Sequence, residues 1–231
     1  MTWIGFRELP IEHSPGLPHG RFIAGTDTDV GKTFYVSHLL RTMRNANVRV
    51  GGYKPVASGF PREDARSDAA RMNLAMGDAF PLSLINPQCF LPPFAPPIAA
   101  EISHSTIDES LLVNGAFAWY PHCDWLLVEG AGGLLSPITW NMTNADLARQ
   151  LNYPLIIVAA NRLGCVHQVL STVHCALQFS LRIDRIVMNC VDNKMTQRDA
   201  ENNLRLLMPF LQRIDKDILI ESLPYESAPE D

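Results

Sequence analysis

The sequence predicts an α/β fold in which a mainly parallel β-sheet carries helices on both faces. Short β-rich runs alternate with helical patterns along the chain, and several of these runs, such as LIIVA at 155–159, are apolar without interruption. Uninterrupted apolar strands are typical of a sheet that is buried on both faces. One domain of this kind accounts for 231 residues of which 47% are hydrophobic.

The first half of the chain opens with a βαβ unit. We expect, in order, a strand, a helix and a strand at 21–26, 31–46 and 48–56. A helical pattern follows at 65–76, and a second helix is expected at 105–119. The intervening residues 77–97 are rich in proline, so we expect them to form a surface loop.

The second half repeats the alternation of strands and helices. We expect strands at 124–133, 154–160, 182–192 and 217–225, and helices at 144–152, 166–179 and 196–211. Residues 1–20 contain three prolines and three glycines, and we expect a loosely ordered extension there. A single domain then spans 21–231.

Composition excludes some classes of partner. The formal net charge of −5 gives no general attraction to nucleic acid or to anionic membranes, and no run of residues is apolar enough to span a membrane. The five cysteines include no CxxC pair, which favours free thiols in a reducing compartment such as the cytoplasm. The histidines show no HExxH motif, so no zinc ligands are assigned.

The stretch GTDTDVGKT at 25–33 predicts a phosphate-binding loop between the first strand and the first helix. Gly31 allows close approach of the backbone, Lys32 can reach the β and γ phosphates, and the Thr33 hydroxyl can bind Mg2+. Thr26 stands where the strict pattern has glycine, but Gly25 lies one position earlier, which fits a turn that is one residue longer. The alternative is a flexible turn with an exposed lysine.

Three further side chains lie near the end of a predicted strand or the start of a predicted helix, where ligands bind in parallel sheets. Glu129, in the stretch VEGAGG, is a candidate magnesium ligand because Mg2+ prefers a few carboxylate oxygens and keeps its waters. Lys54, in GYKPVASG, can point at a transferring phosphate, although a lone lysine there is more often solvated. Asp68, in RSDA, is equally typical of a helix N-cap.

Five stretches occur along the chain in this order: GTDTDVGKT, KPVASG, SDA, VEGAGG and RLGCVH. With them, the chain over 21–225 resembles the dethiobiotin synthetase family, which has a P-loop NTPase-like fold. The resemblance implies ATP-dependent ring closure between CO2 and 7,8-diaminopelargonate, a step of biotin biosynthesis that yields ADP and phosphate. A carbamate on one amine is phosphorylated, and the second amine then displaces phosphate from the mixed anhydride. The co-substrate is ATP and the cofactor is Mg2+.

The resemblance also implies residue roles. Thr33, Asp68 and Glu129 would hold Mg2+, Lys32 and Lys54 would be catalytic, and Thr28 and Ser58 would contact substrate. The nucleotide would bind to both glycine-containing loops and to the segments that contact its base. The residues concerned are Asp29, Val30, Gly31, Lys32, Thr33, Phe34, Asp68, Glu129, Gly130, Ala131, Gly132, Asn189, Cys190, Pro224 and Tyr225. An amide such as that of Asn189 can donate to and accept from an adenine edge, although an asparagine can also simply cap a turn.

A loop supplied by a partner subunit completes the site in this family. The matching residues are Gly164, Cys165, Val166 and His167, whose backbone amides can hold the substrate carboxylate. The resemblance therefore implies a homodimer with shared active sites. The chain departs from the family pattern at Asp29, His167 and Cys190, where glutamate, asparagine and aspartate are usual, and these departures concern substrate and base contacts more than magnesium contacts.

Three other functions compete with this interpretation. A cobyrinate-type amidoligase also phosphorylates an oxygen, but such chains usually carry an additional glutaminase domain. A partitioning or targeting ATPase usually has a second lysine early in the loop, which this chain lacks. A relative that binds nucleotide without turnover is the third. ATP hydrolysis that depends on a diamine and CO2 distinguishes the ligase from all three.

Overall fold

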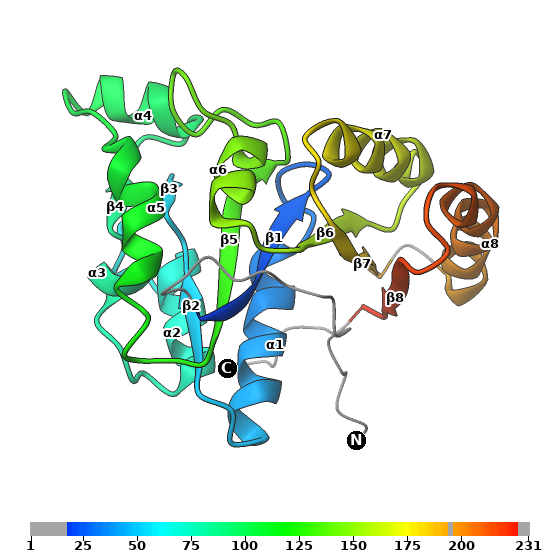
Figure 1. Ribbon diagram of the computed structural model, residues 1–231, viewed down its shortest axis with the longest axis horizontal. Helices are drawn as coiled ribbons and strands as arrows, with labels where there is room; N and C mark the ends of the chain where they lie inside the picture. Colours follow the sequence, from blue (N-terminus) through cyan, green and yellow to red (C-terminus); the bar gives the residue numbers. More distant parts are fainter. Residues whose placement is uncertain (1–17, 194–195, 226–231) are drawn as a thin grey trace.

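The computed structural model describes residues 18–193 and 196–225, and a six-stranded sheet forms its centre (Figure 1). The order across the sheet is β2-β5-β1-β6-β7-β8, and every neighbouring pair is parallel. The predicted α/β fold is therefore confirmed. The strands are β1 (His19–Gly25), β2 (Val50–Tyr53), β5 (Trp125–Gly133), β6 (Leu155–Ala160), β7 (Ile183–Asn189) and β8 (Leu219–Leu223).

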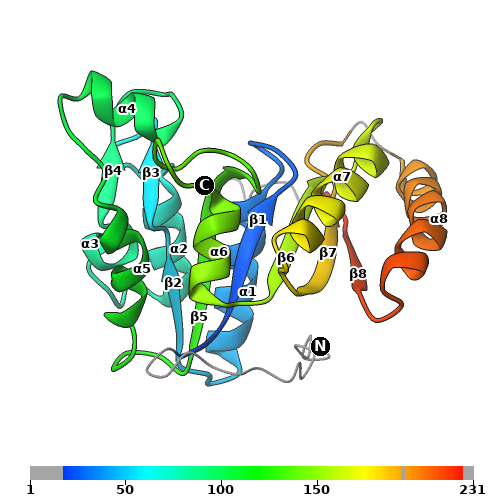
Figure 2. The same cartoon turned by 45° about the horizontal axis from the view of Figure 1, so that its top comes forward.

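Helices cover both faces of this sheet, as Figure 2 shows. On one face lie α1 (Lys32–Asn45) and α2 (Asp68–Met76), and on the other lie α6 (Asn144–Leu151) and α7 (Cys165–Gln178). All six residues of β6 are buried, which explains the uninterrupted apolar run in the sequence. Two further helices, α5 (Glu109–Phe117) and α8 (Gln197–Ile214), pack against α6 and α7 respectively.

Local sequence signals fix several helix ends. The Thr143 side chain accepts a hydrogen bond from the amide of Asp146, whose carboxylate accepts one from the Thr143 amide, and this capping box starts α6. The Ser67 hydroxyl caps α2 by accepting from the amide of Ala70 at 3.0 Å. Because Ser67 is the cap, Asp68 occupies the first turn, and its carboxylate can serve another purpose.

The first strand begins earlier than the sequence suggested. β1 starts at His19, whose amide donates to the carbonyl of Asp124 at 3.0 Å and which lies opposite Trp125 in the sheet. The expectation of an extension through residue 20 is therefore wrong for His19 and Gly20, because pairing with β5 includes them. Pro18 is described and lies outside any strand or helix, and residues 1–17 lie outside the described residues.

The proline-rich stretch 77–97 is not a simple loop. It contains α3 (Leu82–Ile85) and β4 (Gln88–Phe90), and its last prolines begin α4 (Pro96–Ile102), because proline suits the first turn of a helix. β4 pairs in parallel with β3 (Val56–Ser58) in a second, two-stranded sheet. The single strand expected at 48–56 is therefore divided at Lys54 and Pro55, since the Lys54 amide donates to the Ile85 carbonyl at 2.7 Å.

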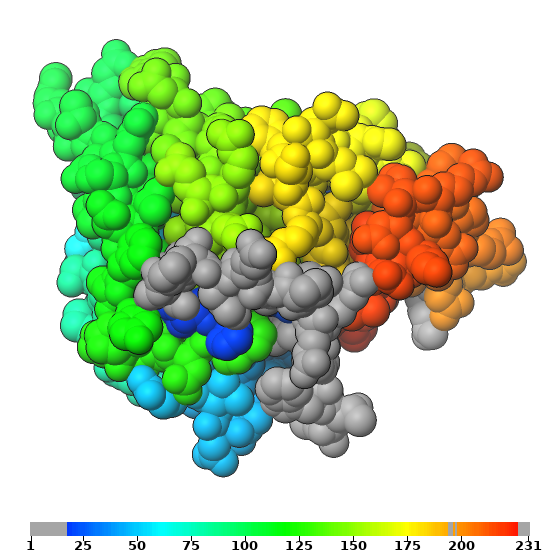
Figure 3. Space-filling view, in the orientation of Figure 1, coloured from blue at the N-terminus to red at the C-terminus, as the bar shows by residue number. Residues whose placement is uncertain are grey.

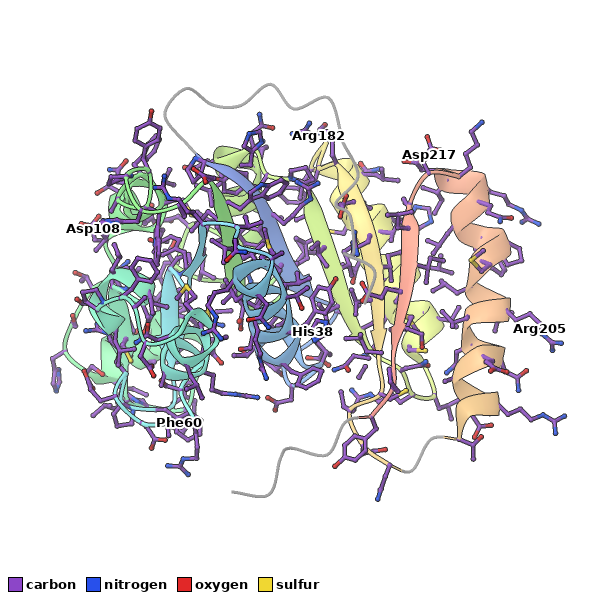
Figure 4. All side chains as sticks on the ribbon, turned by 90° about the horizontal axis from the view of Figure 1, so that it is seen from below. His38, Phe60, Asp108, Arg182, Arg205 and Asp217 are labelled. Carbon is purple, nitrogen blue, oxygen red and sulfur yellow. The ribbon has the colours of Figure 1, made fainter. Side chains whose placement is uncertain are left out.

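The parallel arrangement brings the carboxyl ends of all six strands to one edge of the sheet. In Figure 4, Phe60 lies toward this edge, whereas Arg182 and Asp217, just before β7 and β8, lie at the opposite edge. The molecule is longest across the strands, with α4 and α8 at its two extremes (Figure 3). Among helices of the described residues, none has both the length and the apolar character that crossing a membrane requires.

Candidate active site

A cleft of about 540 Å3 opens at the carboxyl edge of the sheet. Its walls come from the loop after β1, the β2–β3 segment, the start of α2 and the ends of β5 and β7. These segments are spread over most of the chain, and the parallel sheet gathers them at one place. The cleft has the size of a small-molecule site.

The loop between β1 and α1 forms one wall. Gly31 precedes the helix in the left-handed region with φ of 89°, and no side chain caps the first turn of α1. The first amides of the helix thus lack a side-chain partner, an arrangement that suits a phosphate group. Lys32 is only 7% exposed, and its Nζ donates to the carbonyl of Asp27 at 2.9 Å.

Gly31 lies directly against the side chain of Asn189 at the end of β7. The Asn189 amide nitrogen donates to the carbonyl of Val30 at 3.0 Å, and a Cβ on Gly31 would lie 2.0 Å from that nitrogen. The left-handed φ of Gly31 independently disfavours a side chain. The phosphate loop and the expected base-reading residue are therefore one packed unit.

Replacing Gly31 with alanine is expected to weaken ADP binding at least about tenfold, because the new methyl group must displace Asn189 and strain the loop by about 1–3 kcal/mol. Calorimetric titration with ADP, together with thermal melting, measures both effects. Gly133→Ala is the matched control, since its Cβ would come no closer than 3.4 Å to any neighbouring atom. An unchanged ADP affinity in Gly31→Ala would contradict this account.

Lys54, Asp68, Glu129 and Thr33 form a polar cluster at the floor of the cleft. Lys54 Nζ lies 2.7 Å from both Asp68 Oδ2 and Glu129 Oε1. Thr33 Oγ1 lies 2.7 Å from Asp68 Oδ1 and 2.8 Å from Glu129 Oε1. Because one hydroxyl has a single proton, it can donate to only one of these two carboxylates at a time.

Burial and neighbouring charges set the protonation of this cluster. Burial, followed by repulsion from Lys54, lowers the pKa of Lys32 to about 8. Burial alone would lower the pKa of Lys54, but Asp68 and Glu129 outweigh it and raise that pKa. Burial alone would raise the pKa of Asp68, but the charge and hydrogen bond of Lys54 lower it. Burial raises the pKa of Glu129 against the opposing charge of Lys54.

Two carboxylates and a hydroxyl are an oxygen set that suits Mg2+, which keeps several water ligands. Glu129 Oε2 supports this use, because it is buried and has no hydrogen-bond partner in the structure. A cation at this position would satisfy the orphaned oxygen, whose burial without a partner is otherwise costly. Within 18–193 and 196–225 no three His, Cys, Asp or Glu side chains gather in a way that could hold a metal ion by themselves.

The structure brings most of the expected site residues to the cleft. Val30 and Gly130 lie beside it, since their carbonyls accept hydrogen bonds from Asn189 and Lys54, at 3.0 and 3.2 Å. Leu223 lies opposite Asn189 across the β7–β8 pair, and Pro224 follows it. The expected residues that line the cleft are Thr28, Asp29, Gly31, Lys32, Thr33, Phe34, Lys54, Ser58, Asp68, Glu129, Ala131, Gly132, Asn189, Cys190 and Tyr225.

One expected segment is absent from this cleft. Gly164, Cys165, Val166 and His167 do not line it, and the neighbouring Leu163 is 98% exposed. Gly164, with φ of 91°, precedes α7 without a side-chain cap, so the amides there resemble those of the phosphate loop. Within one chain, the two candidate binding loops serve different surfaces.

The cleft also contains residues that the sequence did not single out. Arg66 stacks over Phe60 at 4.8 Å, and its guanidinium donates two hydrogen bonds to Asp64, at 2.9 and 2.8 Å. No local motif marks this pair, because the contact depends on how the β3–α2 loop folds. The additional lining residues are Ala57, Phe60, Arg66, Ser67, Ala69, Arg71, Asn86, Cys89 and Val191.

The chain has clear relatives among known proteins. A protein family described as an AAA domain matches residues 19–221. The ATP-dependent dethiobiotin synthetase BioD of Alteromonas mediterranea is 35% identical over 225 residues, which cover 90% of this chain and 92% of that protein. The protein of the same name from Caulobacter sp. strain K31 is 34% identical and covers 82% and 83%. That of Anaeromyxobacter dehalogenans is 39% identical and covers 74% and 76%.

Among solved structures, chloroplast FtsY from Physcomitrella patens covers 91% of this chain and 59% of its own, with 14% identity and a TM-score of 0.49. The sequence relatives, in contrast, align over most of both chains and share one name. Their agreement with the clustered lysines and carboxylates leads to one conclusion: the chain belongs to the ATP-dependent dethiobiotin synthetase family.

Proposed function

We propose that this protein closes the cyclic urea of dethiobiotin from 7,8-diaminopelargonate and CO2, with conversion of ATP to ADP and phosphate. The observation that carries the proposal is the convergence of Lys32, Lys54 and Thr33 with two carboxylates at one end of the sheet. Phosphoryl transfer depends on positioned charges more than on covalent chemistry by the protein, and this cleft supplies them.

The phosphate loop would orient ATP. Amides of residues 29–34 would surround the phosphates, and Lys32, held by the Asp27 carbonyl, would lie beside the group in transfer. The side-chain nitrogen of Asn189 already donates to the Val30 carbonyl, so the side-chain oxygen of Asn189 is the atom left to accept a hydrogen bond from a base. Cys190, Pro224 and Tyr225 would border that base.

Mg2+ is the metal that the oxygen set fits, and Thr33, Asp68 and Glu129 would hold it. When bound, it would neutralise charge on the phosphate oxygens of ATP. Lys54 would stabilise negative charge on the carbamate and on the phosphoryl group that it receives, and Thr28 and Ser58 would contact the substrate. The second amine of the substrate then attacks the carbamic-phosphoric anhydride, phosphate leaves, and the ring closes.

The substrate carboxylate would bind a partner subunit. The amides of Gly164, Cys165 and Val166, with His167, lie away from the cleft of their own chain, so a second copy is needed for them to complete a site. We therefore propose a homodimer with shared active sites. A small-molecule enzyme with five free cysteines and a net charge of −5 also fits a cytoplasmic location without nucleic-acid or membrane partners.

An ADP-release assay tests this function directly. The protein is incubated with Mg-ATP and bicarbonate, with and without 7,8-diaminopelargonate, and the product is identified by mass spectrometry. Diamine-dependent ADP release together with the mass of the cyclic urea is the expected result. ADP binding without diamine-dependent turnover would contradict the ligase and would favour a protein that only binds nucleotide.

Shared sites predict complementation between two inactive variants. Lys32→Met removes a cleft residue, and His167→Asp places a carboxylate at an exposed position in the first turn of α7, where the substrate carboxylate would bind. Because random mixing makes half of the dimers mixed, with one intact site in each, about one quarter of wild-type activity should return. Each variant alone is the control, and no recovery in verified mixed dimers would show that each chain has a self-contained site.

A further inference from the structure

The ammonium group of Lys54 lies between the two carboxylates that the proposed function assigns to Mg2+. Its Nζ is 2.7 Å from Asp68 Oδ2, 2.7 Å from Glu129 Oε1 and 3.2 Å from the carbonyl oxygen of Gly130. The Lys54 side chain is 4% exposed, that of Glu129 1% and that of Asp68 30%, so water screens the contact with Glu129 little and the contact with Asp68 more. The contact is a buried ion pair with three acceptors.

The same two carboxylates, Asp68 and Glu129, would have to neutralise a lysine and a metal ion together. Glu129 Oε1 already accepts from Lys54 and lies 2.8 Å from Thr33 Oγ1, so a metal ion would take Oε2, which has no hydrogen-bond partner among the described residues. A divalent cation bound by Thr33, Asp68 and Glu129 would bring two positive charges within a few ångströms of the ammonium. Repulsion at that distance is large in a buried site, so one of the two cations must move.

The charge balance of the cleft favours entry of the metal together with nucleotide. Lys32 and Lys54 carry two positive charges, and the ionised Asp68 and Glu129 carry two negative charges. A divalent cation alone would leave these four groups with an excess of two positive charges, and Asp29, Arg66 and Arg71, which also line the cleft, add one more. ATP or ADP brings the negative charge that offsets this excess, and its phosphates offer new acceptors to the displaced ammonium.

We propose that Lys54 competes with the metal ion for Asp68 and Glu129, so that binding of metal with nucleotide displaces its ammonium toward the phosphates. The proposal rests on the proposed function, because it uses the same metal-binding residues. Lys54 has an unbranched, flexible stem, so its head group can change partners without movement of the backbone. Binding of the metal would in this way move the Lys54 ammonium next to the phosphoryl group that reacts.

Binding of Mn2+ to the nucleotide-free protein tests the competition, with electron paramagnetic resonance as a measure of free Mn2+. Lys54→Met is expected to bind Mn2+ at least about tenfold more tightly than the wild type, because the competing ammonium is gone. Lys32→Met is the matched control: it removes the same charge from the same cleft, but its Nζ donates to the Asp27 carbonyl rather than to the carboxylates. For Lys32→Met, we expect the affinity for Mn2+ to rise by less than about threefold.

The possible outcomes distinguish failure of this inference from failure of the proposed metal site. Equal gains in both variants would show a general charge effect, and no gain in Lys54→Met would show that the lysine does not compete; either result overturns the inference. If the wild type fails to bind Mn2+ even with saturating ADP, the proposed metal site itself is wrong. Thermal melting with and without Mn2+ confirms that each variant is folded.

A measurement on the wild type covers the case in which Lys54→Met does not fold. Lysine side chains labelled with 15N give an ammonium signal for a buried, ion-paired lysine, and the signal is assigned by its absence in Lys54→Arg. Saturation with Mg2+ and ADP together is expected to shift this signal or to speed exchange of its protons with water. An unchanged Lys54 signal in the saturated protein would overturn the displacement.

Discussion

Replacement of Lys32 with methionine should lower kcat about 10²- to 10³-fold, which corresponds to roughly 2.7–4 kcal/mol, as is typical when one preorganised donor at a transition state is lost. Lys32 is 7% exposed and its ammonium is held by the Asp27 carbonyl at 2.9 Å, so little reorganisation is needed when charge develops on the phosphoryl group. Methionine retains the length of the stem but removes the charge. Single-turnover ADP formation measures the effect.

The fold should survive this change. Burial lowers the pKa of Lys32 to about 8, which shows that the folded protein holds this charge at a cost. The melting temperature of Lys32→Met should therefore equal or exceed that of the wild type. Lys216→Met is the control, because Lys216 is an exposed lysine between α8 and β8 and should leave kcat unchanged. A kcat of Lys32→Met within about threefold of the wild type would refute the catalytic role.

Replacement of Glu129 with glutamine should raise the Mg2+ concentration needed for half-maximal activity at least about tenfold. The side chain is 1% exposed, and Oε2 has no partner among the described residues, so it is the oxygen best placed for a cation. Glutamine keeps the shape but removes the negative charge and replaces one carboxylate oxygen with an amide nitrogen, which does not bind Mg2+. A magnesium titration of ADP release measures the effect.

Loss of a buried carboxylate can also destabilise the protein, by about 3–5 kcal/mol when a buried pair is broken. Glu221→Gln controls for this effect. Glu221 Oε2 accepts hydrogen bonds from Arg185 Nη1 at 3.1 Å and from the Tyr35 hydroxyl at 2.9 Å, in a separate cluster between α1 and β8. Glu221→Gln should lower the melting temperature without changing the magnesium requirement. An unchanged titration in Glu129→Gln would exclude Glu129 as a ligand.

The sequence predicted the sheet well because burial on both faces leaves an unmistakable pattern. The uninterrupted apolar run of β6, for example, needs no tertiary information to be recognised. The phosphate loop and Glu129 were found in the same way, from strand ends followed by small residues. Local sequence therefore identified the residues whose placement depends mainly on the strand that precedes them.

Features that depend on distant contacts were missed. The prolines in residues 77–97 predicted a loop. The strand in that region was missed because it exists only by pairing with β3, about thirty residues away. The role of Asp68 was ambiguous from the sequence, because it could have capped a helix. In the structure Ser67 is the cap, so the Asp68 carboxylate is available to pair with Lys54. The stacked Phe60 and Arg66 had no sequence signal, since the contact exists only once the loop is folded.

The strand order also has a consequence for how the enzyme is made. β5 lies between β2 and β1, and it pairs His19 with Trp125, so the centre of the sheet joins segments roughly a hundred residues apart in the chain. During synthesis, β1, α1 and β2 emerge first but have no neighbour to pair with until β5 follows. Glu129 arrives on that same strand. Completion of the central sheet and completion of the cluster of Lys54, Asp68 and Glu129 are therefore a single folding event, and a chain that stops before β5 has neither.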